Sequence, residues 1–235
     1  MSRRPEPNCT TRDRLIREAT ALFARQGFDG TRTADIERAA GLAPGSGGAF
    51  RYFPSKRRLL ADGVTELVGR ATSFRAVVTD GVAGLDAALD GGDLVHAYRS
   101  LGSAVLAFAD EVADASTVVL REAGVSRHEV PELADLAHQF ARSNYDAVAE
   151  VFDAWLRRRG VDTDRVDLPV AVYLAFAPLF HARAVAWLLG ESPGGIDDCR
   201  LLDVWASTQV SLLRWLLESR SAGGAGSPRS ADQRD

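Results

Sequence analysis

The stretch that decides the fold is TRTADIERAAGLAPGSGGAFRYFPSKRRLL, residues 31–60. Residues 33–40 predict a short helix, because acidic residues fall in its positively polarised first turn and Gly41 follows its end. A glycine-rich turn comes next, and residues 49–53 predict a second short helix. Two short helices joined by a glycine turn are typical of a helix-turn-helix, which presents one helix to the major groove of DNA.

Positive charge gathers where this motif ends. Pro54 ends the second helix, Ser55 can cap the next one, and Lys56 begins a run of three cations with Arg57 and Arg58. We therefore expect the exit of the motif to carry side chains that can bind DNA phosphates.

At these residues the chain resembles the TetR family of bacterial transcriptional regulators. An amphipathic helix ending in Gly27-Phe28 comes first, and the match then consists of Thr31, Asp35-Ile36, Ala40-Gly41-Leu42 and Phe50-Arg51-Tyr52-Phe53-Pro54-Ser55-Lys56. The resemblance covers roughly the first sixty residues, about a quarter of the chain. The family places its Tyr-Phe pair about ten residues after the turn glycine, whereas here two extra residues lie in the segment 44–48.

The motif assigns its residues to two kinds of DNA contact. For phosphates we expect Thr31 or Thr33, Arg32, Tyr52 and Lys56. For bases we expect Ser46, Arg51 and the edge of Phe50, with Pro44 able to meet a thymine methyl group and Gly47 and Gly48 letting the main chain come close. The alternative left open is that Phe50 and Phe53 are core residues and that Arg51 is merely solvated.

Composition and charge suit a globular DNA-binding protein. The chain has 235 residues and a formal net charge of −4, but residues 1–60 hold 12 Lys and Arg against 6 Asp and Glu, and the remainder holds 16 against 26. The amino-terminal part is therefore basic and the rest acidic. Basic residues next to a helix-turn-helix favour a nucleic-acid partner.

Periodicity after the motif predicts helices only. No segment alternates long enough to indicate a strand, so the fold class is all-α with about nine helices. The expected helices are 11–26, 33–40, 49–53, 57–78, 94–111, 116–123, 130–159, 167–189 and 197–219, with a short helical turn over 85–89. We expect a disordered arm over 1–10, a DNA-binding domain over 11–56, a ligand-binding and dimerisation domain over 57–220 and a disordered tail over 221–235.

The last two helices are too apolar to be packed on one side only. The resemblance implies that they pair with the same helices of a second copy, which makes a homodimer suited to a palindromic operator. The residues expected at this interface are Trp187, Leu201, Trp205, Leu212 and Leu216.

The middle helices are expected to enclose a small, largely apolar effector that releases a repressor from its operator by a population shift through the helix 57–78. Polar or aromatic side chains in otherwise oily helices are the candidates to hold it, although each could equally be an ordinary core residue. They are Tyr98, Phe108, His138, Asn144, Tyr173 and His181.

Other functions find little support in the sequence. We expect no cofactor, no metal site and no catalytic residue, because nucleotide, hydrolase and zinc motifs are lacking. Without a signal peptide pattern or a long uninterrupted apolar run, the expected location is the cytoplasm and no membrane partner is expected. A helical enzyme, with His138 and Glu150 or His181 and Glu191 as arbitrary acid and base, and a partner-binding module remain the alternatives.

Overall fold

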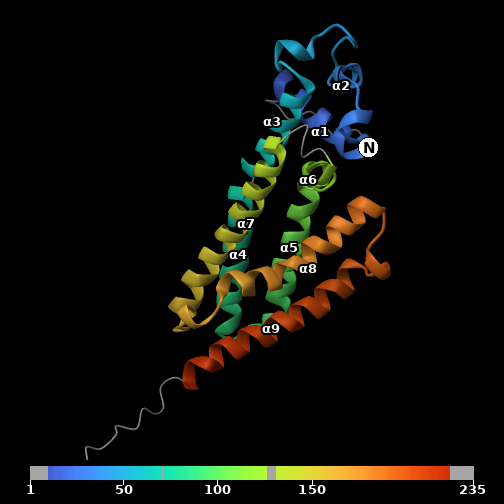
Figure 1. Ribbon diagram of the computed structural model, residues 1–235. Coiled ribbons are helices and arrows are strands. Elements are labelled where there is room, and N and C mark those ends of the chain that lie inside the picture. The colour runs from blue at the N-terminus through green and yellow to red at the C-terminus, as the bar shows by residue number, and fades with distance from the viewer. Residues whose placement is uncertain (1–9, 70, 126–130, 223–235) are drawn as a thin grey trace, which may run out of the picture.

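The computed structural model describes residues 10–69, 71–125 and 131–222 (Figure 1). Every regular element in these ranges is helical, which confirms the all-α class. The α-helices are α1 Thr11–Gly30, α2 Thr33–Ala39, α3 Lys56–Gly69, α4 Ala71–Leu89, α5 Leu94–Glu111, α6 Ala113–Val125, α7 Pro131–Arg158, α8 Leu168–Leu189 and α9 Asp198–Ala222; single 3₁₀ turns are η1 Ala49–Arg51, η2 Thr163–Arg165 and η3 Pro193–Gly195. Residues 1–9 and 223–235 of the predicted arm and tail lie outside the described residues.

The molecule is elongated, with a head at one end (Figure 1). The head consists of α1, α2, η1 and the start of α3, and the body consists of the remaining helices. In the body, α4, α5 and α7 run lengthwise away from the head, and α8 and α9 lie against them toward the far end (Figure 1). Helix α6 lies directly under the head, in contact with α1.

Helix starts follow the capping residues in the sequence. Thr10 and Asp13 form a reciprocal capping box at α1, with bonds of 3.2 and 3.0 Å. Asp93, Asp167 and Asp197 each accept a backbone N–H three residues later, at the starts of α5, α8 and α9. Each cap accepts a hydrogen bond from a backbone N–H that the first helical turn leaves unpaired. Because the cap and this N–H are three residues apart, such helix starts can be predicted from the local sequence.

One helix prediction in the middle of the chain is wrong. The described residues of the helix expected over 57–78 are helical, in α3 and the first part of α4, but α4 runs on through Gly81 and Gly84, where a break was expected. The reason is packing: a Cβ on Gly81 would lie 2.4 Å from Cδ1 of Leu101 on α5. Gly81 therefore lets α5 approach α4 closely, and it does not act as a stop.

The described apolar side chains form two separate clusters. The head cluster contains Phe23, Ile36 and Phe53, and it continues along α3 as far as Val64. The body cluster extends from Phe74 in α4 to side chains of α9. The head's core therefore reaches past residue 56, where we had placed the boundary of the DNA-binding domain.

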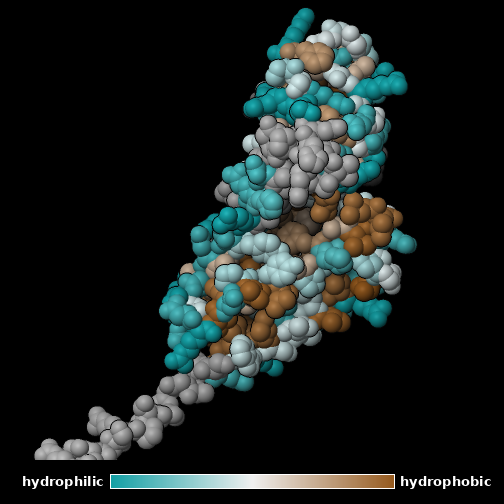
Figure 2. All heavy atoms as spheres, viewed as in Figure 1, coloured by the Kyte–Doolittle hydropathy of each residue, from teal (hydrophilic) through white to brown (hydrophobic). Residues whose placement is uncertain are grey.

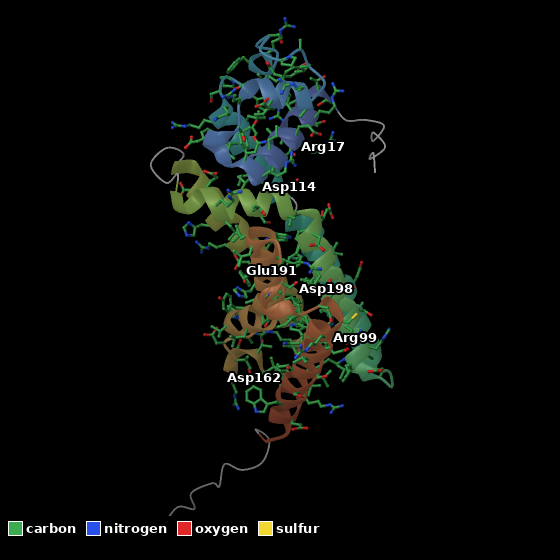
Figure 3. The ribbon with its side chains drawn as sticks, turned by 90° about the vertical axis from the view of Figure 1, so that its right-hand side faces the viewer. Arg17, Arg99, Asp114, Asp162, Glu191 and Asp198 are labelled. Atoms are coloured by element: carbon green, nitrogen blue, oxygen red, sulfur yellow. The ribbon has the colours of Figure 1, made fainter. Side chains whose placement is uncertain are left out.

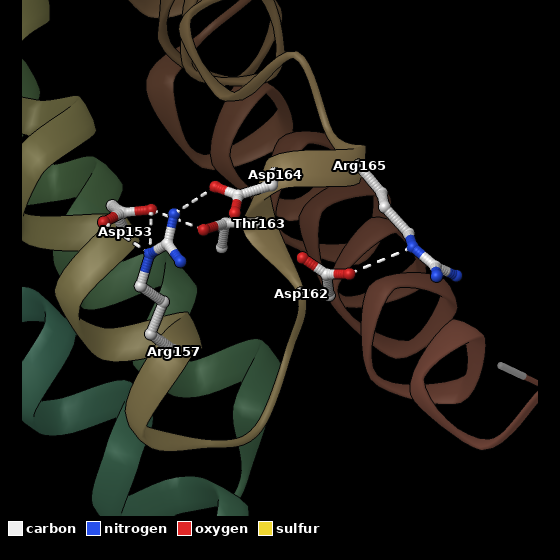
Figure 4. Close-up of polar contacts among 6 residues, drawn as sticks. All are labelled: Asp153, Arg157, Asp162, Thr163, Asp164 and Arg165. Carbon is white, nitrogen blue, oxygen red and sulfur yellow. Dashed lines mark hydrogen bonds and ion pairs between the residues drawn. The ribbon is translucent and has the colours of Figure 1, made fainter. Parts of the chain in front are cut away.

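Polar contacts fasten the far end of the body. Arg159 Nε and Trp155 Nε1 donate to Asp86 Oδ1 at 2.7 and 2.6 Å. The hydrogen bond from Arg159 and then that from Trp155 hold the pKa of the Asp86 carboxyl below its usual range. Close by, Arg157 bonds Asp153 and Asp164 across the turn that follows α7 (Figure 4). These contacts tie the end of α7 to α4 and to the segment that leads into α8.

Helix α8 is the most apolar element. By length and composition alone it is the one described helix that could cross a membrane, and little of it is buried. Arg183 in its second half pairs with Asp110 of α5 and Asp198 of α9, at 3.0 and 2.8 Å. Figure 3 shows Asp198 at the start of α9, beside α5, which carries Arg99. Ion pairs to two other helices attach α8 to the body.

The close packing of α5 on α9 gives a test of the fold. A Cβ on Gly102 would lie 2.6 Å from Leu202 Cδ2 and 2.8 Å from Trp205 Cζ3. We expect Gly102→Ala to lower the free energy of unfolding by about 1–3 kcal/mol, measured by chemical denaturation, because neither neighbour can move without disturbing the core. In Gly84→Ala the new Cβ meets nothing within 4 Å, and we expect a gain of about 0.5–1 kcal/mol. Equal stabilities for both variants would contradict the packing of α5 on α9.

Candidate DNA-binding site

The glycine turn between α2 and η1 is fixed by one buried carboxylate. Glu37 in α2 is only 1% exposed. Its Oε2 accepts the N–H of Gly45 at 2.6 Å, and its Oε1 accepts the N–H of Ala49 at 3.0 Å. Hydrogen bonds to a charged acceptor are stronger than neutral ones, so Glu37 ties both ends of the turn to α2.

Sequence reasoning placed Glu37 only in the first turn of a helix and missed this role. The available signal was its position on the inner face, since Ile36 before it and Ala40 three residues later are both buried. A carboxylate on the apolar face of a short helix needs donors from a neighbouring segment, and here the turn supplies them.

The second helix of the motif is shorter than predicted. Only Ala49–Arg51 is regular, as one 3₁₀ turn, where a helix over 49–53 was expected. Gly45 and Gly47 have φ values of 74° and 72°, a left-handed conformation that cannot be part of a right-handed helix, and Pro54 follows closely. The long turn thus leaves room for a single helical turn, and few side chains remain to contact bases.

Six of the eleven predicted DNA-contact residues are exposed on the head: Arg32, Pro44, Ser46, Phe50, Arg51 and Tyr52. Phe50 is 54% exposed and Tyr52 is 46% exposed, whereas Phe53 is 2% exposed. The open alternative is thereby resolved for the two phenylalanines, since Phe53 is a core residue and Phe50 is not. An exposed aromatic ring beside Arg51 is available to contact a base.

Some of the predicted contact residues serve the head itself. Thr31 is 1% exposed, and its hydroxyl donates to the Gly27 carbonyl at 2.8 Å. Ser46 donates to the Ala43 carbonyl at 2.7 Å, which stabilises the turn while its side chain stays exposed. Thr33 and Gly48 are half-buried. The expectation that the Thr31 side chain binds a phosphate is therefore wrong, because this side chain faces the interior.

Lys56 also points inward. Its Nζ donates to the carbonyls of Phe28 and Thr31 at 2.7 and 3.0 Å, and it lies 4.1 Å from the centre of the Phe28 ring. A cation over an aromatic face adds to these bonds. Lys56 thus braces the start of α3 against the link between α1 and α2, and only its third N–H remains for a phosphate.

In the body, a small apolar cavity of about 40 Å³ lies among α5, α7, α8 and α9. Its lining includes Phe152, Trp155, Phe176, Trp205, Tyr98 and Gln209. Pockets for drug-sized ligands measure about 300–1,000 Å³, so this cavity admits such a ligand only if the helices around it move apart.

The predicted effector residues are not brought together. Tyr98 lines the cavity, and burial raises the pKa of its hydroxyl. Phe108 packs on Phe74 with ring centres 4.9 Å apart, and Asn144 is 8% exposed. The other three, His138, Tyr173 and His181, are exposed, so the expectation that they face the interior is wrong.

The residues predicted at the dimer interface are buried or partly buried within the chain itself. Trp205 and Leu216 are 4% and 7% exposed and line the cavity, so they belong to the core of the chain itself. Leu201 and Leu212 are partly buried against the same core, and Trp187 is half-buried. The large apolar side chains exposed on α8 and α9 are different ones: Val170, Tyr173, Leu174, Leu188, Leu189, Val204 and Trp215. Sequence periodicity missed them because α8 is apolar on all sides.

The role of Glu37 can be tested by substitution. In Glu37→Gln, the side-chain NH₂ would face one of the two backbone N–H groups, at Gly45 or Ala49, as a second donor. We expect the free energy of unfolding to fall by about 1–3 kcal/mol in chemical denaturation, because a donor left without an acceptor costs about that much. Asp35→Asn is the matched control, because Asp35 pairs with Arg38 on the surface of the same helix. That change should cost less than about 1 kcal/mol. Similar losses in both variants would contradict the anchoring role.

Comparison with known sequences supports the motif. Residues 15–62 match the family of bacterial regulatory proteins, tetR family. A search of the curated proteins gives no significant match.

Comparison with solved structures covers most of the chain. A candidate TetR-family regulator from Mesorhizobium loti has a TM-score of 0.63 at 18% identity, covering 86% of this chain and 96% of that one. The fatty acid degradation regulator FadR from Bacillus halodurans has a TM-score of 0.55 at 16% identity, over 87% and 95% of the two chains. Salmonella enterica GusR has a TM-score of 0.54 at 21% identity, over 88% and 95%.

These structural similarities concern the fold, since all three identities are low. The head matches at the level of sequence, and the whole chain matches at the level of structure. The amino-terminal residues 15–62 thus match the bacterial regulatory proteins of the tetR family, and the chain as a whole is similar in fold to solved TetR-family regulators.

Proposed function

We propose that this protein is a ligand-responsive repressor that binds a palindromic operator as a homodimer and is released by a small, largely apolar molecule. The observation that carries the proposal is the exposed set Phe50, Arg51 and Tyr52, held on a turn that Glu37 fixes. A rigid turn that exposes an arginine and two aromatic rings is suited to a duplex groove.

Charge supports DNA as the partner. The first 60 residues hold twice as many Lys and Arg as Asp and Glu, and the rest of the chain has an acidic excess. Phosphates therefore attract the head and repel the body, so the protein meets DNA with the head first. Arg32, exposed at the start of α2, is placed to bind the backbone, while Arg51 on η1 is placed to read a base.

Exposed apolar surface on α8 and α9 supports a dimer. Of twelve large apolar side chains that are exposed among the described residues, seven lie on these two helices. Val170, Leu174 and Leu188 share one stripe of α8, and Val204 and Trp215 share one stripe of α9. Figure 2 shows apolar surface gathered toward these helices, while the head surface is mostly hydrophilic. A second copy that covers this surface would place two heads on one duplex.

The interior supports an effector that works by moving helices. The cavity is apolar and small, and Asn144 on α7 has a buried Oδ1 without a hydrogen-bond partner among the described residues. A largely apolar molecule with one hydrogen-bond donor could fill the cavity and bond Asn144 Oδ1 only if α7 moved away from the neighbouring helices. Ligand binding then favours a conformation in which the helices are further apart, which is the population shift that releases DNA. The repressor role rests on the family, whose members mostly block promoters.

Base reading by Arg51 gives the first test. Purified protein is used to select duplexes from a random library, and we expect a palindromic site. Arg51→Ala should weaken binding to that site by about 1–3 kcal/mol and relax the preference at one position in each half-site. The control is Arg142→Ala, which removes the same charge from an exposed position on α7 and should leave affinity and preference unchanged. Equal effects of both variants would mean that Arg51 acts only through its charge.

The dimer surface gives the second test. Val204 is 65% exposed on α9, and we expect Val204→Glu to shift the protein from dimer to monomer in sedimentation at micromolar concentration, because the carboxylate would be buried in an apolar interface. Leu120→Glu is the control, since Leu120 is 49% exposed on α6, outside the proposed interface. A monomeric wild-type protein, or a dimer unaffected by Val204→Glu, would contradict the proposed interface.

A further inference from the structure

Helix α6 is built into the core of the head although it lies among the helices of the body. Val118 of α6 is 0% exposed and belongs to the head cluster, while the neighbouring Val119 packs against both clusters. Figure 3 shows Asp114, at the start of α6, directly below the head helix that carries Arg17. Helix α6 thus contacts the head independently of the covalent connection through α3.

A buried carboxylate of α6 reaches the kink in α1. Glu122 is 8% exposed, and its Oε1 accepts the backbone N–H of Phe28 at 2.9 Å. The residue before, Gly27, has the non-helical angles φ 74° and ψ 167° that interrupt α1. A Cβ there would lie 3.5 Å from the same Oε1. Glu122 therefore supplies the acceptor for a backbone donor at the point where α1 changes direction.

The adjacent arginine binds the other side of this kink. Arg121 Nη1 donates to the carbonyl of Ala24 at 2.6 Å. The last carbonyls before a helix ends lack intrahelical partners, and they carry partial negative charge. Arg121 and Glu122 thus bind a carbonyl and an N–H on the two sides of Gly27.

From the kink, hydrogen bonds continue to the DNA-facing elements. The Phe28 carbonyl, next to the N–H that Glu122 holds, accepts from Lys56 at 2.7 Å. The same ammonium group bonds the Thr31 carbonyl, and the Thr31 hydroxyl bonds the Gly27 carbonyl. Arg32, the exposed residue that immediately precedes α2, comes directly after Thr31. A displacement of Glu122 would therefore be passed on to the start of α2 and the start of α3.

We propose that Glu122 is a positioning residue that sets the place of α2 in the head from α6. Its effect on DNA binding rests on the proposed function, whereas its effect on the head is independent of DNA. A movement of the body helices that displaces α6 would then change the position of Arg32 without bending α3. This gives the head a second mechanical connection to the body besides the α3–α4 connection.

The test is amide hydrogen exchange of the full chain without DNA. In Glu122→Ala the Phe28 N–H loses its acceptor, so amides in residues 28–36 should exchange about tenfold faster than in the wild type. Glu122→Gln keeps a side-chain carbonyl at the same place and should stay within about threefold of the wild type. Amides in α5 should be unchanged in both. Glu150→Ala, at an exposed glutamate on α7, is the control and should alter neither segment.

DNA binding provides the second measurement. On a duplex selected with the wild-type protein, Glu122→Ala should bind about tenfold more weakly and Glu122→Gln about as well as the wild type. If Glu122→Ala does not fold, Arg121→Ala takes its place, with the same segment expected to exchange about threefold to tenfold faster.

The outcomes separate the two proposals. Unchanged exchange in residues 28–36, or an equal rise in α5, would overturn the positioning role whatever the DNA result. A wild-type protein that binds no duplex would refute the proposed function, while faster exchange confined to residues 28–36 would still support the role of Glu122.

Discussion

The geometry of the head depends on the side chain of Glu37, buried beneath a turn rich in glycine. Glycine loses more conformational freedom on folding than any other residue, so a turn with Gly45, Gly47 and Gly48 would not hold one shape by itself. Two hydrogen bonds from backbone N–H groups to this carboxylate compensate for that loss. The position of Phe50 and Arg51, directly after the turn, follows from them.

The same device occurs at three places where the backbone of the head departs from regular helix. Glu37 binds N–H groups at the turn, Glu122 binds one at the kink of α1, and Lys56 binds two carbonyls between α1 and α2. Charged side chains from three different helices thus fasten irregular segments whose backbone groups would otherwise need water. Because one of these helices is α6, the shape of the head depends on the body. Most of the exposed large apolar side chains among the described residues lie away from the head, on α8 and α9, so contacts with DNA and contacts with a second copy need not compete.

Local signals in the sequence predicted much of the fold. The structure confirms the helix starts expected next to Asp93, Asp167 and Asp197 and the helical periodicity of the long segments, and both depend on neighbours along the chain. The errors concern contacts between distant segments. Gly81 looked like a stop because the approach of α5 is not visible locally, and Trp205 looked like a surface residue because α9 is apolar on several sides. In the site, exposure of Arg51 was predictable from the motif, whereas the inward turn of Lys56 required the positions of two carbonyls.

The most direct measurement of the central claim is photochemical cross-linking of the wild-type protein to a bound duplex in which single thymines are replaced by 5-iodouracil. An exposed ring at Phe50 that contacts a base edge should give adducts on the peptide that contains residues 49–51, at one thymine position in each half-site. Adducts confined to other parts of the chain, or at every substituted thymine alike, would contradict the account in which the turn held by Glu37 presents η1 to the bases.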